Sequence, residues 1–111
     1  MSEMIKNIEK EKVFKIAEAV AYEEGGVSSL TLAQKPGVGI TILAFDAGEG
    51  VSSHAAPGDA LVVVLEGEAI ITIDGKENHV GAGDSVVMPA GIPHAVKALT
   101  KYKMLLTVVK E

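Results

Sequence analysis

Two spacings of glycine and histidine in the second half of the chain constrain its fold more than any other feature. They read Gly48-x5-His54-x12-Gly67 and Gly83-x5-Pro89-x-Gly91-x2-His94. Gly67 follows an apolar run and Gly83 precedes a second one, so both stand where a strand must turn. Such positions need either a positive φ or room for a close backbone approach, and glycine supplies both. The two spacings therefore indicate a chain of short strands joined by fixed turns.

The rest of the pattern agrees with an all-β chain. Apolar, β-branched segments recur every 8–12 residues or so, as in antiparallel sandwiches and barrels. The predicted strands are 27–33, 38–45, 60–65, 69–73, 77–80, 85–88, 93–98 and 104–109. Asp74-Gly75 between two of them is a hairpin signal. Residues 1–26 are predicted to form an N-terminal arm, with a short helix or turn near Val13–Ala19, ahead of a single barrel domain over 27–111.

Composition narrows the functional classes. The net charge is −5, which disfavours nucleic-acid binding because phosphates need a basic surface. All ten basic residues are lysines, so bidentate arginine contacts to strongly anionic ligands are absent. The N-terminus is charged, and the longest apolar run, Ala60–Leu65, is far shorter than the roughly 20 residues of a membrane span. We therefore expect a cytoplasmic protein without membrane contact.

The two spacings resemble the two signature motifs of the cupin superfamily, in the small single-domain, RmlC-like jelly-roll type. The resemblance covers about residues 38–109 and implies a small double-stranded β-helix barrel. It also implies that His54 and His94 face one cavity, where the family commonly holds a metal with three histidines and one glutamate. Here the positions of the second histidine and the glutamate hold Ala56 and Ala60.

Two further side chains are candidates for the site. Asp59 lies one residue before the position of the missing glutamate, so strand alternation would turn it away unless Pro57-Gly58 resets the alternation. A turn or capping role is the other interpretation of Asp59. His79 follows the hairpin and is expected on the outer face. Met88 is expected beneath His94 as a core residue rather than a ligand.

Three functions remain open at this point. The first is a small-molecule-binding cupin with a degenerate metal site, acting as a sensor or accessory protein. The second is a metal-dependent isomerase or oxygenase for a small sugar or organic acid, holding one divalent zinc, iron, manganese or nickel ion weakly through His54, His94 and Asp59. The third is a metal-free enzyme in which the two histidines act as acid and base. The resemblance also implies a homodimer, with Val27–Ala33 as the exchanged strand.

Overall fold

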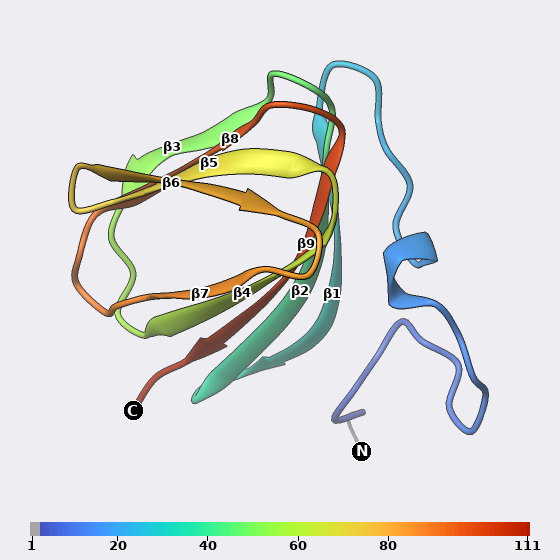
Figure 1. The fold of residues 1–111 in the computed structure, drawn as a ribbon. Coiled ribbons are helices and arrows are strands. Elements are labelled where there is room, and N and C mark those ends of the chain that lie inside the picture. The colour runs from blue at the N-terminus through green and yellow to red at the C-terminus, as the bar shows by residue number, and fades with distance from the viewer. Residues whose placement is uncertain (1–2) are drawn as a thin grey trace.

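The computed structural model describes residues 3–111 and has two antiparallel sheets that face each other as the walls of a small barrel (Figure 1). The five-stranded sheet has the order β1-β2-β9-β4-β7, and the four-stranded sheet has the order β3-β8-β5-β6. The elements are η1 (Ile16–Glu18), β1 (Val27–Lys35), β2 (Val38–Phe45), β3 (Gly50–His54), β4 (Asp59–Glu66), β5 (Glu68–Ile73), β6 (Lys76–Gly81), β7 (Ser85–Met88), β8 (His94–Ala98) and β9 (Tyr102–Val109).

Strand register defines the inner face of the five-stranded sheet. Because directly paired residues share a face, one row of partners crosses the whole sheet from β1 to β7. This row consists of Gln34, Gly39, Val108, Ala60 and Met88. Its neighbours along β4, including Val62 and Val64, are buried in the main core. Every second residue of β4, starting from Ala60, is therefore directed into the barrel.

Phe45 and Tyr102 close one end of the barrel interior. Their ring centroids lie 5.5 Å apart at an interplanar angle of 54°, and neither side chain is exposed. Burial raises the pKa of the Tyr102 phenol to about 12. Because these two side chains fill this end of the barrel, a cavity inside the barrel is expected at the opposite end.

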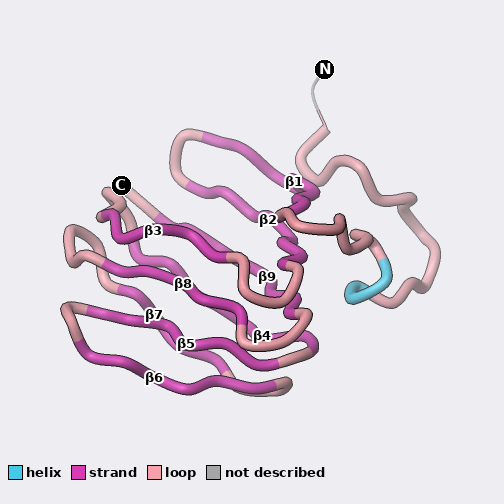
Figure 2. Tube along the Cα trace, turned by 90° about the horizontal axis from the view of Figure 1, so that it is seen from above, coloured by secondary structure: helices cyan, strands magenta, loops and turns pink. Residues whose placement is uncertain are grey.

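A second, smaller core lies outside the barrel, between the five-stranded sheet and the N-terminal arm. The arm runs beside β1 and β2 in both views (Figures 1 and 2). Val20 of the arm packs with Ile42 and Ala44 of β2, whose side chains are fully buried. Since β2 is buried on both faces, it reads as an almost continuous apolar run in the sequence.

A polar cluster fastens the arm to the sheet. The Lys103 ammonium donates to the carbonyl oxygen of Ala17 at 2.6 Å and lies 4.6 Å from the ring centroid of Tyr22. The Tyr22 hydroxyl donates to Glu66 at 2.6 Å, and Lys103 is 3.6 Å from the same carboxylate. Burial and the neighbouring Glu66 raise the pKa of Tyr22. Lys103 is only 7% exposed, so its charge is matched by these partners.

The two turn glycines are confirmed, for different reasons. Gly67 has φ +80°, and a Cβ placed there would lie 1.9 Å from the carbonyl oxygen of Lys101. Gly83 has φ +93°, but a Cβ there would meet nothing within 4 Å. Gly67 therefore needs both a positive φ and the close approach of another backbone, whereas Gly83 needs only the φ.

Most strand predictions hold, and one strand is new. Residues 38–45 and 85–88 are strands with the predicted bounds, and the arm contains a single 3-10 turn over 16–18. The sequence did not predict β3, which carries His54. Its Ser52 and Ser53 are exposed, and its pairing with β8 is irregular between Val51 and His54, so no apolar alternation marks it. Within residues 3–111, no helix is long and apolar enough to cross a membrane.

Candidate functional site

His54 and His94 face each other across two neighbouring strands. His54 is the last residue of β3 and His94 is the first of β8, and the pairing register places them directly opposite each other. Their ring centroids are 4.5 Å apart with an interplanar angle of 65°, an edge-to-face arrangement. His94 is 5% exposed, whereas His54 is exposed at the rim. The fold thus unites two residues that lie forty positions apart in the sequence.

Each imidazole is oriented by a backbone carbonyl two residues earlier. The distance from Nδ1 to the carbonyl oxygen is 3.1 Å for His54 and Ser52, and 3.3 Å for His94 and Ile92. Because a carbonyl can only accept, each Nδ1 must carry the hydrogen and donate it. In the neutral ring the lone pair then lies on Nε2, which has no protein hydrogen-bond partner in the described part of the chain. Each Nε2 can therefore accept a hydrogen bond or bind a metal.

Two hydrogen bonds hold the segments that carry the histidines in place. The backbone N–H of Gly91 donates to the carbonyl oxygen of Ala56 at 2.8 Å. The backbone N–H of Ala90 donates to Oδ1 of Asp59, also at 2.8 Å. These bonds join the loop after His54 to the turn before His94, so the relative position of the two rings depends on both.

The histidines open onto a cavity of about 210 Å³ at the end of the barrel opposite Phe45 and Tyr102. Its lining consists of the two histidines and apolar side chains: Leu43, Val51, His54, Ala56, Ala60, Met88, His94, Ala95, Val96, Met104, Leu106 and Val108. Met88 lies in this lining, as expected. The contribution of β9 was not anticipated, although alternate apolar residues along 104–109 were a usable signal.

Ala56 and Ala60 both line this cavity beside the histidines. These are the positions at which a metal-binding member of the resembled family would carry its second histidine and its glutamate. In residues 3–111, no group of three or more histidine, aspartate or glutamate side chains is placed to hold a metal ion. The residues present therefore do not fit the usual four-ligand set, and a metal here would depend on two imidazoles.

Asp59 is not brought together with the histidines. It begins β4 and is exposed, and its neighbour Ala60 takes the inward position. Its carboxylate accepts the Ala90 N–H, which is the turn role that sequence reasoning gave as the alternative. His79 lies on the outer surface, where its Nε2 is 2.8 Å from a carboxylate oxygen of Glu68.

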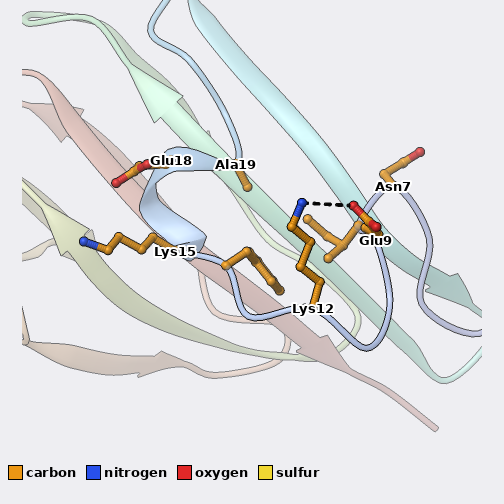
Figure 3. A pocket seen from close by; sticks show the side chains of 8 residues that line it. Asn7, Glu9, Lys12, Lys15, Glu18 and Ala19 are labelled. Atoms are coloured by element: carbon orange, nitrogen blue, oxygen red, sulfur yellow. Dashed lines mark hydrogen bonds and ion pairs between the residues drawn. The ribbon is translucent and has the colours of Figure 1, made fainter.

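A larger hollow of about 400 Å³ lies elsewhere, along the N-terminal arm (Figure 3). It is bordered by Asn7, Glu9, Lys12, Lys15 and Glu18 among others, and an ion pair of 3.5 Å joins Lys12 to Glu9. All of these charged side chains are exposed. The barrel cavity is the smaller of the two hollows, but it holds the convergent imidazoles and the apolar walls typical of ligand sites.

A comparison with protein families and a comparison with solved structures agree on the family. The cupin-domain family (Cupin_2) matches residues 41–110. A conserved protein of unknown function from Streptococcus pyogenes superposes with a TM-score of 0.96 and 44% identity, over 99% of this chain and 96% of that one. A cupin superfamily protein from Desulfitobacterium hafniense superposes with a TM-score of 0.92 and 33% identity, over 96% of this chain and 98% of that one.

A short stretch of sequence also resembles a transcriptional regulator. A stretch of 38 residues is 45% identical to the HTH-type transcriptional regulator PuuR of Escherichia coli. The matched stretch covers 34% of this chain and spans only 20% of the regulator's length.

Proposed function

This chain belongs to the cupin superfamily, and from that we propose that it is a ligand-binding member, in a sensor or accessory role, whose barrel takes up a small molecule. The observation that carries the proposal is the pairing of His54 and His94, at 4.5 Å between ring centroids, over a cavity with no acidic lining residue. Two imidazoles with free Nε2 atoms supply hydrogen-bond acceptors, and the remaining walls are apolar. Such a site favours a small ligand whose part inside this cavity is weakly polar.

The partial likeness to a transcriptional regulator supports a sensing role. The matched stretch spans only 20% of that regulator, and the net charge of −5 disfavours contact between this chain and nucleic acid. We therefore propose that the barrel reports on a metabolite rather than contacting nucleic acid.

A metal-dependent enzyme is the second candidate. It is favoured by the Nδ1–H bonds from both histidines to backbone carbonyls, because metal-binding imidazoles are commonly oriented in this way. Two imidazoles completed by water would hold a divalent ion such as zinc, iron, manganese or nickel only weakly. A metal-free acid–base enzyme would use the same two rings, but no titratable side chain besides these two histidines is among the residues that line the cavity.

Elemental analysis of protein purified without a chelator or affinity tag separates these candidates. We expect far less than one metal ion per chain, with no further loss in His54→Ala or His94→Ala. Near-stoichiometric metal that disappears in both variants would overturn the binding-protein proposal and favour the metalloenzyme.

Ligand uptake is tested by an NMR screen with neutral small-molecule fragments. Ala56→Leu fills part of the cavity, while Ala55→Leu adds the same side chain at an exposed neighbour outside the lining. We expect fragments to perturb the signals of His54 and His94 in the wild type and in Ala55→Leu, but not in Ala56→Leu. Equal binding by all three proteins would show that the cavity is not the site.

We also propose a homodimer that forms through the edge of the five-stranded sheet. β1 is the edge strand, and the arm already occupies part of it through the Lys6 N–H to the Leu32 carbonyl at 2.8 Å and the Asn7 amide to the Thr31 carbonyl at 2.7 Å. In the described residues, the backbone of 27–30, at the start of the predicted exchange strand, makes no hydrogen bond to the arm. A monomer mass by gel filtration with light scattering would contradict this proposal.

A further inference from the structure

We propose that the ligand is a short amphiphile, with a hydrogen-bond donor at one end, an aliphatic middle and a carboxylate or similar anion at the other end. This inference rests on the proposed ligand-binding function and specifies the chemical class of the ligand. It comes from a second hollow that continues the histidine cavity across the inner face of the five-stranded sheet.

The second hollow has a volume of about 180 Å³ and shares Leu106 and Val108 with the histidine cavity. Register shows that both hollows lie on the same face. Leu106 pairs with Thr41, and Val108 pairs with Gly39 on one side and with Ala60 on the other. The two hollows are therefore successive parts of one trough that runs from β4 through β9 to β2 and β1.

The far end of this trough is rich in hydrogen-bond donors. Gln34, Thr41 and Lys110 line it together with Lys35, and no aspartate or glutamate is among its lining residues. The Lys110 ammonium has no hydrogen-bond or ion-pair partner in residues 3–111. The Lys110 ammonium and the Thr41 hydroxyl both offer donors to one anionic group.

Gly39 gives this end its room. A Cβ at Gly39 would lie 3.6 Å from Oε1 of Gln34, so the Gln34 side chain extends over the glycine toward the trough. Any larger residue at that position would fill the floor between Gln34 and Val108, which are its neighbours in the cross-strand row. The polar end and the apolar middle are thus continuous because the residue between them has no side chain.

The histidine end has the opposite hydrogen-bonding character. With the hydrogen on Nδ1, each neutral ring presents an acceptor at Nε2, which matches a hydroxyl or another donor on the ligand. Ala60 of β4, which lines the cavity beside the histidines, and Gly39 of β2 are two strand spacings apart, about 10 Å. A six-carbon chain together with its two polar end groups extends about as far as this span. The wall between the two ends is formed by Leu106 and Val108 and is apolar.

Three probes of the same chain length test separately whether the site requires the hydroxyl end and the anionic end of the ligand. 6-Hydroxyhexanoate carries both end groups, hexanoate lacks the hydroxyl, and hexane-1,6-diol lacks the carboxylate. Titration of ¹⁵N-labelled protein, followed by NMR, gives the affinity and the location of each probe. We expect 6-hydroxyhexanoate to bind about tenfold more tightly than either of the others, since each loses one matched polar contact.

Two variants assign the ends, and one serves as control. Lys110→Gln should weaken 6-hydroxyhexanoate and hexanoate about tenfold and leave the diol unchanged. His54→Ala, at an exposed rim position, should weaken the two hydroxyl-bearing probes and leave hexanoate unchanged. Lys76→Gln removes an exposed lysine of the β6 strand, outside both hollows, and should change none of the affinities.

The outcomes separate this inference from the function on which it rests. If the diol binds as tightly as 6-hydroxyhexanoate, or if Lys110→Gln has no more effect than Lys76→Gln, the anionic end is wrong and small-molecule binding stands. If no probe shifts the signals of the trough, this ligand class is wrong. If the neutral fragments also fail to bind, the ligand-binding function fails with it.

Discussion

Gly67 and Gly83 make a matched pair for testing why glycine is required at the two turns. Both have positive φ, +80° and +93°, so alanine at either position pays for a left-handed backbone. That cost is about 1–2 kcal/mol, partly offset because alanine restricts the unfolded chain. Since a Cβ at Gly83 meets nothing within 4 Å, we expect Gly83→Ala to lower the free energy of unfolding by about 1 kcal/mol.

Gly67→Ala has an additional cost. Its Cβ would lie 1.9 Å from the Lys101 carbonyl oxygen and 2.9 Å from Cα of Tyr102, so the start of β9 must move. Tyr102 is fully buried against Phe45, and a shift there disturbs the closed end of the barrel. Overpacking of this kind costs roughly 1–3 kcal/mol beyond the φ term of about 1 kcal/mol, so we expect a total of about 2–4 kcal/mol.

The assay is equilibrium unfolding in guanidinium chloride, followed by circular dichroism, for the wild type and both variants. The expected order of midpoints is wild type, then Gly83→Ala, then Gly67→Ala, with the second gap larger than the first. Complete loss of the folded state in Gly67→Ala alone would be the extreme form of this result. Equal midpoints for the two variants, or a lower one for Gly83→Ala, would refute the close-approach argument.

Three other changes have defined outcomes. Folding raises the pKa of Tyr102 to about 12, so the stability that its neutral phenol contributes is complete below about pH 10 and is lost as the pH rises toward 12. Tyr102→Phe should therefore lose less stability at alkaline pH than the wild type does. Unfolding midpoints of both proteins at neutral and alkaline pH measure this difference. Lys103→Met removes the donor to the Ala17 carbonyl and should lower the free energy of unfolding by about 1–3 kcal/mol. Trypsin should then cleave the arm faster than in the wild type, while the barrel stays folded. The double variant Ala56→His with Ala60→Glu supplies the two missing ligands and should therefore bind zinc or manganese tightly, as measured by calorimetry. A metal affinity equal to that of the wild type would show that the cavity cannot direct these side chains to a common centre.

The sequence predicted the barrel well because its turns are encoded locally. A left-handed turn that tolerates only glycine marks the end of a strand directly, as at Gly67, and an apolar run buried on both faces marks a strand such as β2. Neither signal depends on knowing which strands are neighbours. Fold class and most strand bounds therefore follow from short stretches of the chain.

The site was harder to predict because it depends on pairing across the sheets. The facing of His54 and His94 follows from the register of β3 with β8, and β3 has exposed serines in place of an apolar alternation. The resemblance, rather than any local pattern, predicted that the two rings share a cavity. Similarly, the contribution of Gln34 and Thr41 to the trough requires the β1–β2 register, which only the folded chain reveals.

The strands that carry the two histidines differ in the number of neighbouring strands with which they pair. β8 lies inside its sheet between β3 and β5, whereas β3 lies at the edge and is held by β8 alone, with an irregularity just before His54. Separation of β3 breaks one short ladder and leaves every other strand pair intact, so its amides should exchange with solvent faster than those of β8. His54 therefore lies on the less supported side of the cavity and His94 on the better supported side. For the proposed ligand, separation of β3 from β8 would be a route inward that leaves the rest of the barrel closed.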